Sequence, residues 1–341
     1  TATAAADADV GNTHILALTP AAASGGGIFQ YWKPITIPVA NLGASCSADL
    51  GDFPLLISIT DPDLASNARD DGYDIVFRGL DDTVCGGAGT APCGLYHEVE
   101  KWDSSTGELL AWVKIPTLSS SNDTTIHMYY GNPNVTVQSE NASQVWDANF
   151  KGVWHLKEAT NATNMDSTSN SNDGTPQVSP LAATGKIAGA LNFETGANTT
   201  RVDVGTDSSL DLSQYSNWTI SAWVKPSSNY TDRNYPTIYT YGDWRVQVGI
   251  AVAEGPEDGR IENYRNDASA VYNNTAMNIN EWNHVVVVRD STTTYFYLNG
   301  VDDGSGASVS INQDNSGSHI GGYPGYNDGA LMGLIDEVRM S

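Results

Sequence analysis

Basic residues are scarce in this sequence, and their scarcity excludes several classes of partner. The chain has 16 Lys and Arg residues against 40 Asp and Glu residues, a net charge of −24. A surface of this sign repels the phosphates of nucleic acids and anionic lipids, so we expect neither as a partner. No apolar run approaches the roughly 20 residues that cross a bilayer, so we expect no membrane insertion. The start, TATAAA, is compatible with a mature N-terminus after cleavage or with an arbitrary boundary.

Cysteine is also scarce, with three residues in the chain. Cys85 and Cys93 bracket the Gly-rich loop GGAGTAP. A disulfide there stabilises such a loop by roughly 2–3 kcal/mol through chain entropy. Two unpaired buried thiols are the alternative, but we expect the bridge because the loop has no other means of closing. Cys46 is then left over, and three cysteines without neighbouring histidines do not make a zinc site.

Charged residues make up only 16% of the chain, and Ser, Thr, Asn and Gly must therefore carry much of the surface. This composition is typical of secreted β-proteins and poor for helices. Short runs of strand-forming residues, several with period two, lie at 35–39, 55–59, 74–77, 96–100, 109–115 and 125–130, separated by turn residues. The spacing predicts a β-sandwich over residues 28–147.

A second all-β domain is predicted over residues 148–341. WNHVVVV at 282–288 is an apolar strand run, and YFYLNG at 295–300 is a strand that ends in Asn-Gly, a strong hairpin signal. We therefore predict an all-β chain of two sandwich domains.

Both domains resemble known families. The second resembles the laminin-G-like, concanavalin A-like jelly roll through GVWHL at 152–156, the loop at 166–174, GKIAGALNF at 185–193, WTISAWVKP at 218–226, the segments at 282–300, and GLIDEV at 333–338. The first resembles an uncharacterised extracellular family that often precedes it, through YWK at 31–33, DLGDFPL at 49–55, GYDIVF at 72–77, AWVKIP at 111–116 and YYGN at 129–132. The resemblance implies an extracellular protein that makes contacts, and it implies no activity for the first domain.

Residues 1–27 differ from both domains. THILALT at 13–19 predicts one short strand, and PAAASGGG at 20–27 has the composition of a flexible linker. A lone strand must pair with a sheet edge, either of its own chain or of a neighbour. Thr13, Ile15, Leu16 and Leu18 are the candidates for strand exchange.

Paired catalytic carboxylates are not evident. Glucanases on this jelly roll carry carboxylates on one strand face, about 5 Å apart. Glu98 and Glu100 share a face but lie in the first domain, and we expect a solvated strand face there. Asp336 and Glu337 are adjacent, so we expect them on opposite faces. We therefore expect no enzyme.

Calcium is the predicted ion. The loop DSTSNSNDG at 166–174 is dense in the oxygen ligands that calcium prefers. By the laminin-G-like resemblance, Asp166, Asn172 and Asp336 are candidate ligands of a structural ion. The alternative is a turn in which Asp, Ser and Asn side chains bond the backbone.

Two features of the sequence concern carbohydrate. Tyr323 and Tyr326 lie in a polar loop that either faces a sugar or packs on the domain edge. Candidate glycosylation sites, each an Asn-x-Ser/Thr sequence, are Asn122, Asn134, Asn141, Asn161, Asn198, Asn217, Asn229 and Asn273.

Together these features predict a non-catalytic extracellular protein, a subunit of a surface filament or fibre that assembles by adding residues 13–19 to a neighbour. Its partners would be copies of itself, and also glycans. The alternative is a monomeric carbohydrate-binding module or adhesin, and a glycoside-active enzyme is a distant third.

Overall fold

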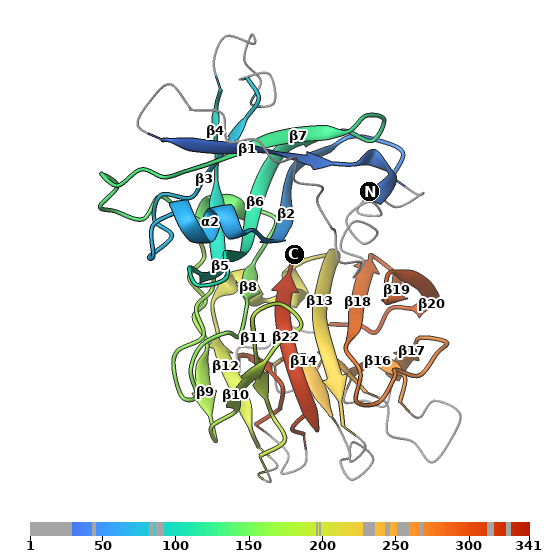
Figure 1. The fold of residues 1–341 in the computed structure, drawn as a ribbon. Helices are drawn as coiled ribbons and strands as arrows, with labels where there is room; N and C mark the ends of the chain where they lie inside the picture. The colour runs from blue at the N-terminus through green and yellow to red at the C-terminus, as the bar shows by residue number, and fades with distance from the viewer. Residues whose placement is uncertain are drawn as a thin grey trace. The chain divides into compact units, whose positions relative to one another are not determined.

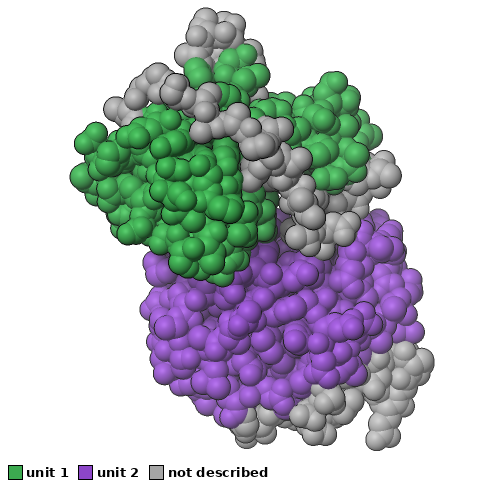
Figure 2. Space-filling model, viewed as in Figure 1, with its two compact units in different colours: residues 1–147 green, residues 148–341 purple. Residues whose placement is uncertain are grey.

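A computed structural model describes residues 29–42, 46–81, 85, 92–195, 197, 199–227, 236–242, 246–250, 259–265, 269–311, 317–324 and 329–341. The chain divides into two compact units, Thr1–Asp147 and Ala148–Ser341, coloured separately in Figure 2. Each unit has its own hydrophobic core. No helix in the described ranges is long and apolar enough to cross a membrane. The predicted strand at 13–19 lies outside the described residues.

The first unit is built from two antiparallel sheets (Figure 1). The four-stranded sheet has the order β1-β7-β3-β4, with β1 (Tyr31–Ile37), β7 (Thr124–Tyr130), β3 (Val76–Gly79) and β4 (Gly94–Leu95). The three-stranded sheet has the order β2-β6-β5, with β2 (Leu50–Thr60), β6 (Glu108–Leu118) and β5 (His97–Asp103). Helices η2 (Val39–Asn41), α2 (Pro62–Asn67) and α3 (Ala142–Val145) lie between or after these strands in the chain.

The period-two patterns of the first unit place apolar residues inside. In β2, Leu55, Ile57 and Ile59 are buried and alternate with residues that are partly or fully exposed. Asp61 caps α2 by accepting a hydrogen bond from the Asp63 amide, and Pro62 occupies the first helical turn, where a missing N–H costs nothing.

The second unit is a sandwich of an eight-stranded and a seven-stranded sheet. The first sheet has the order β10-β11-β22-β13-β18-β19-β20, and β8 also pairs with β22; the strands are β10 (Leu181–Thr184), β11 (Gly189–Asn192), β22 (Gly333–Met340), β13 (Asn217–Pro226), β18 (Asn283–Asp290), β19 (Thr293–Leu298), β20 (Val301–Ala307) and β8 (Gly152–Trp154). The second has the order β17-β16-β15-β14-β21-β12-β9; the strands are β17 (Ser269–Tyr272), β16 (Ile261–Arg265), β15 (Val246–Ile250), β14 (Thr237–Tyr241), β21 (Ser318–Ile320), β12 (Arg201–Gly205) and β9 (Thr175–Gln177). The all-β prediction is confirmed.

The structure also confirms the predicted disulfide and the predicted Asn-Gly hairpin. Cys85 and Cys93 form the predicted disulfide. Cys46 is a free, half-buried thiol. The hairpin at Asn299 and Gly300 is present between β19 and β20, and both residues have positive φ angles, 51° and 77°.

The strand faces predicted for two carboxylate pairs were wrong. Glu98 and Glu100 are each 6% exposed, so their strand face is buried, and Glu98 accepts a hydrogen bond from Trp146 Nε1 at 3.0 Å. Asp336 and Glu337 are both buried. The register of β22 against β13 shifts at this point, and Glu337 has a φ of 54°, so a bulge breaks the alternation that the prediction assumed.

Candidate functional site

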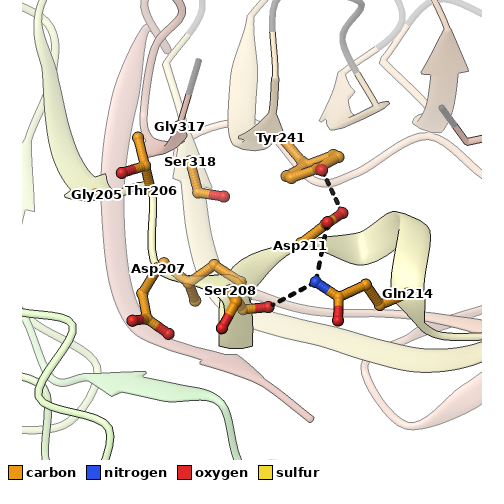
Figure 3. Close-up of a pocket in the computed structure, with 10 residues that line it drawn as sticks. Gly205, Thr206, Asp207, Ser208, Asp211, Gln214, Tyr241, Gly317 and Ser318 are labelled. Carbon is orange, nitrogen blue, oxygen red and sulfur yellow. Dashed lines mark hydrogen bonds between the residues drawn. The ribbon is translucent and has the colours of Figure 1, made fainter. Parts of the chain in front are cut away.

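A small hollow lies at the rim of the second unit, where the seven-stranded sheet meets the segment that follows β12 (Figure 3). Its volume is about 110 Å³. Pockets for drug-sized ligands usually measure roughly 300–1,000 Å³, and water occupies about 30 Å³ per molecule. The hollow therefore accommodates one small polar group or part of one sugar ring. Its lining residues are Gly205, Thr206, Asp207, Ser208, Leu210, Asp211, Gln214, Tyr241, Gly317 and Ser318.

Two short 3-10 helices form the floor, and the local sequence explains both. The sequence DSSLDLSQ at 207–214 contains Asp-x-Ser twice. Asp207 caps η4 (Ser208–Leu210) by accepting from the Ser209 amide at 2.8 Å, and Asp211 caps η5 (Leu212–Gln214) by accepting from the Ser213 amide at 2.9 Å. Leu210 and Leu212 are buried in the core, so they anchor the segment while the carboxylates stay at the rim.

The opposite wall comes from the ends of β12, β14 and β21. Gly205 and Gly317 have φ angles of 97° and 101°, which glycine adopts without strain. A Cβ on Gly317 would lie 3.1 Å from the Gly205 carbonyl oxygen, so a larger residue would crowd the mouth of the hollow. Tyr241 and Ser318 are paired across β14 and β21 and are both buried.

A hydrogen-bond network holds the floor and the opposite wall in place (Figure 3). Asp211 Oδ1 accepts from the Tyr241 hydroxyl and from Ser213 Oγ, and Asp211 Oδ2 accepts from Gln214 Nε2 at 3.0 Å. Gln214 Nε2 also donates to the Ser208 carbonyl at 3.3 Å. The Gln214 amide is therefore oriented, with its oxygen as the remaining acceptor. Such pre-orientation lowers the entropy lost when a ligand binds.

Both carboxylates at the rim are held in the ionised form. Burial alone would raise the pKa of Asp211, but hydrogen bonds from Ser213, Tyr241 and Gln214 outweigh it and hold that pKa below the usual 3.8. The hydrogen bond from the Ser209 amide lowers the pKa of Asp207. A glycosidase needs one carboxylic acid that keeps its proton near neutral pH, and neither residue meets this requirement.

The charge of the hollow is uniformly negative. Its ten lining residues include two Asp and no Lys or Arg. Carboxylates, an amide oxygen and the hydroxyls of Thr206 and Ser208 offer hydrogen bonds to a ligand with several hydroxyl groups. An anionic ligand would be repelled.

The relationship of the two units to known families follows from their sequences. A family model described as "Concanavalin A-like lectin/glucanases superfamily" matches residues 195–341. These residues form a concanavalin A-like domain. A second model, "Domain of unknown function (DUF2341)", matches residues 88–170, ahead of this domain. Both resemblances predicted from the sequence are thus confirmed. No curated protein matches the chain.

Several solved structures are similar to the chain at low sequence identity. Domain 4 of AbnA, a GH43 extracellular arabinanase from Geobacillus stearothermophilus, in complex with arabinotriose, is 19% identical, with a TM-score of 0.43 over 57% of this chain and 93% of that one. A putative carbohydrate binding protein from Bacteroides ovatus is 13% identical, with a TM-score of 0.35 over 86% and 76%. The binding domain of Paraclostridial Mosquitocidal Protein 1 is 15% identical, with a TM-score of 0.42 over 56% and 48%. We draw no functional conclusion from likeness at this level.

The calcium candidates of the second unit lie in two separate hydrogen-bonded settings. Asp166 accepts four hydrogen bonds, from the Val153, Thr168 and Asn172 amides and from Thr168 Oγ1, at 2.8–3.0 Å. Asp336 accepts from the amides of Lys186 and Ile187 at 2.7 and 2.8 Å. This arrangement agrees with the alternative of a side-chain-bonded turn around Asp166. The calcium assignment stays a prediction.

The Asn172 side chain also engages other groups. Its Nδ2 donates to the Lys151 carbonyl at 2.8 Å and to Ser209 Oγ at 2.9 Å. Ser209 is the residue whose amide is capped by Asp207, so the 166–174 loop braces the floor of the hollow. A candidate metal ligand thus also contributes to the support of the rim site.

Among the candidates for glycan contact and glycan attachment, some side chains are buried and others are exposed. Tyr323 is 4% exposed, so its ring packs, the second of the two alternatives that the sequence left open. Tyr326 lies outside the described residues, as do Asn198 and Asn229. Asn122, Asn134, Asn141, Asn161 and Asn217 are exposed.

The prediction of a glycosylation site at Asn273 was wrong. Its side chain is 1% exposed, and its Nδ2 donates to the Thr275 carbonyl and to Asp303 Oδ2. The folded chain therefore has no room for a glycan on this nitrogen.

The rim residues Asp207, Asp211, Gln214 and Tyr241 were not among the candidates predicted from the sequence. The repeated Asp-x-Ser pattern at 207–213 was the available signal for the floor. Nothing local in the sequence indicates that Tyr241 reaches this floor, because the contact depends on how β14 is placed in the sheet.

Proposed function

We propose that this protein is a non-catalytic, extracellular binding protein whose concanavalin A-like domain accepts one neutral sugar residue of a glycan at the rim hollow. The observation that supports it is the fixed set of acceptors around Asp211 and Gln214 in a hollow lined by no basic residue. Neutral sugars present several hydroxyl donors, and charge-assisted hydrogen bonds to a carboxylate are stronger than neutral ones. The low pKa values of Asp207 and Asp211 favour binding over hydrolysis.

Titration calorimetry with neutral oligosaccharides and with uronic-acid oligosaccharides tests this function. We expect the neutral ligands to bind and the uronic-acid ligands to bind at least tenfold more weakly. Asp207→Ala and Gln214→Ala should each weaken neutral-sugar binding about tenfold, which corresponds to about 1.4 kcal/mol. Asp290→Ala removes an exposed carboxylate elsewhere in the same domain and is the matched control.

Three results would contradict the proposal: no binding of any neutral sugar, binding that is unchanged in Asp207→Ala and Gln214→Ala, or release of shortened sugars during incubation. Circular dichroism of each variant shows whether a lost signal reflects the site or the fold.

A second candidate function is a subunit of a surface filament or fibre that assembles through residues 13–19. A long edge strand in the first unit, β2, favours it, because an unpaired edge accepts an added strand. A contact of this kind between unlike surfaces gives a fibre when its rotation does not close into a ring. Negative-stain microscopy of the native protein should show polymers, and deletion of residues 1–20 should abolish them and leave a folded monomer. Polymers that survive the deletion would exclude assembly through this segment.

A further inference from the structure

Strand β2 is a long edge, and its one residue with a positive φ, Asp52 at 52°, lies near its start. It is the terminal strand of the order β2-β6-β5, and its register against β6 runs without a shift from Leu50 to Thr60. Its inward side chains Leu55, Ile57 and Ile59 belong to the core. Pairing with β6 and burial in the core therefore hold the strand in place, and its other side is the edge of the sheet.

The register shows which backbone groups point outward from β2. The Lys114 amide donates to the Tyr96 carbonyl, so Lys114 faces away from β2. Pro54 is opposite Lys114, and residues opposite each other in an antiparallel ladder either both face inward or both face outward. The backbone carbonyl of Pro54 therefore points away from β6. The backbone N–H and C=O groups of Leu56, Ser58 and Thr60 point the same way. Because Pro54 has no N–H, the row of outward donors is interrupted there and continues at Leu56.

This edge lacks the features that usually prevent strand addition. Proteins protect edges with short strands, bulges, charged residues or covering segments. Residues 53–60 carry no charge. Among the described residues, no hydrogen bond reaches the outward amides of Leu56 and Ser58. Among the described residues, no strand pairs with the outer edge of β2 from Leu55 to Thr60.

The other edges of the first unit are protected. Strand β4 is two residues long, and strand β1 has the buried Lys33 and the half-buried Pro34 at its centre. In β5, the Val99 amide donates to Glu140 Oε2 at 2.8 Å, the His97 carbonyl accepts from the Asn141 amide at 2.9 Å, and the register shifts after Val99.

The edges of the second unit are protected too. Strands β9, β10 and β17 are three or four residues long. Strand β20 contains Asp302 and Asp303 and pairs irregularly with β19. Of the edges in the described part of the chain, β2 is the one suited to receive a strand.

The sequence also supplies a segment suited to this edge. Residues 10–32 contain no Asp, Glu, Lys or Arg, although the chain as a whole has a net charge of −24. Within them, THILALT at 13–19 has seven residues, about 23 Å when extended, the length of β2 from Pro54 to Thr60. Contact between two uncharged segments avoids the repulsion that other surfaces of two copies would meet.

We propose that residues 13–19 of a second copy of this chain add to the outer edge of β2, with hydrogen bonds to Leu56 and Ser58. This inference rests on the filament function and names its acceptor surface. Residues 20–30, eleven residues between the segment and β1, reach up to about 36 Å. Connections within a domain are usually about 4–6 residues long, so a tether of this length suits a contact with another molecule.

Two proline variants of the full chain test the added segment and the acceptor strand independently. Leu16→Pro removes a donor from the added segment, with Ala22→Pro in the linker as its control. Ser58→Pro removes an outward donor of β2 at a position of the same row as the native Pro54, with Ser58→Ala, which keeps the amide, as its control. Ser58→Lys protects the edge with a charge and leaves the backbone unchanged, so it replaces Ser58→Pro if that variant fails to fold by circular dichroism.

Light scattering after size-exclusion chromatography measures the mass of the species that each variant forms. We expect polymers from the wild type and both controls, and monomers of 36.3 kDa from Leu16→Pro and from Ser58→Pro or Ser58→Lys. An equimolar mixture of the two monomeric variants should form a dimer and no larger species, because Leu16→Pro keeps the acceptor edge and Ser58→Pro keeps the added segment.

The other outcomes overturn distinct parts of the inference. Polymers from the Ser58 variants but not from Leu16→Pro would exclude β2 as the acceptor and leave the filament function standing. Polymers from both would exclude assembly through residues 13–19. A mixture that stays monomeric would exclude a direct contact between the segment and β2. A monomeric wild type would exclude the filament function itself.

Discussion

The Tyr241 hydroxyl donates a hydrogen bond to Asp211 Oδ1, across 30 positions of the chain. Tyr241 belongs to β14, in the seven-stranded sheet, and Asp211 caps η5 at the rim. The same carboxylate orients Gln214, so this contact couples the wall of the hollow to its floor. The shape of the rim surface is therefore set by the core of the domain.

Removal of this hydroxyl should change both stability and titration. In Tyr241→Phe we expect a loss of about 1–3 kcal/mol in the free energy of unfolding, because a hydrogen bond to a charged group is lost. The pKa of Asp211 should rise, because Tyr241 helps to hold it below 3.8. Chemical denaturation and NMR titration of the carboxyl carbon measure the two effects. Tyr215→Phe, which loses a hydrogen bond to the neutral Ser209 carbonyl, is the control.

The sign of the pH dependence follows from that lowered pKa. Asp211 binds a proton more weakly in the folded chain than in the unfolded chain, so its contribution is complete above the unfolded pKa and is lost as pH falls through the folded one. Asp211→Asn should therefore unfold with a shallower loss of stability on acidification below about pH 4. Equal acid sensitivity in the variant and the wild type would contradict this assignment.

Glu337 should be intolerant of neutralisation. It is buried and pairs with His155 Nδ1 at 2.7 Å and Arg339 Nη2 at 2.9 Å. Burial alone would raise its pKa, but these two partners hold the pKa below 4.5. Glu337→Gln leaves buried partners without their counter-charge, and we expect a loss of roughly 3–5 kcal/mol. Urea denaturation measures it, and the exposed Glu281→Gln should change stability by less than about 0.5 kcal/mol.

The disulfide should contribute through the unfolded chain. The double variant Cys85→Ser/Cys93→Ser is expected to lose roughly 2–3 kcal/mol, the loop-closure entropy of so short a loop. Cys46→Ser, at the free thiol, is the control and should unfold as the wild type does. Thermal unfolding with and without reductant gives an independent reading: reductant should lower the transition temperature of the wild type and leave the double variant unchanged.

Asp166 allows a test of the predicted calcium ion. Asp166→Ala removes the acceptor of four hydrogen bonds, so we expect a loss of at least about 2 kcal/mol with or without calcium. If an ion also binds, calcium should raise the transition temperature of the wild type above its value in a chelator. Equal temperatures in calcium and chelator would make the calcium prediction wrong. Asp302→Ala, at an exposed carboxylate, is the control.

The patterns of single strands were readable from the sequence because each depends on neighbouring residues. The alternation in β2, the apolar run in β18 and the Asn-Gly turn after β19 all report which local side chains are buried. The loop between Cys85 and Cys93 is equally local, and its closure was predicted from its glycines.

The carboxylates show where such patterns fail. Period two placed Asp336 and Glu337 on opposite faces, but the register of β22 against β13 shifts there, and both side chains are buried. A bulge is a property of a pair of strands, so one strand's sequence does not reveal it. The burial of Glu98 was not readable either, because it involves Trp146, which is 48 positions away in the chain.

By itself, the sequence determined two all-β sandwiches, their family resemblances and the disulfide, because period, turn residues and short loops act over a few positions. The tertiary structure alone brought Asp207, Asp211, Tyr241 and Ser318 to one rim, and it alone showed that β2 ends a sheet. These are outcomes of strand order and register. They depend on the packing of segments far apart in the chain, and local side-chain patterns carry no information on it.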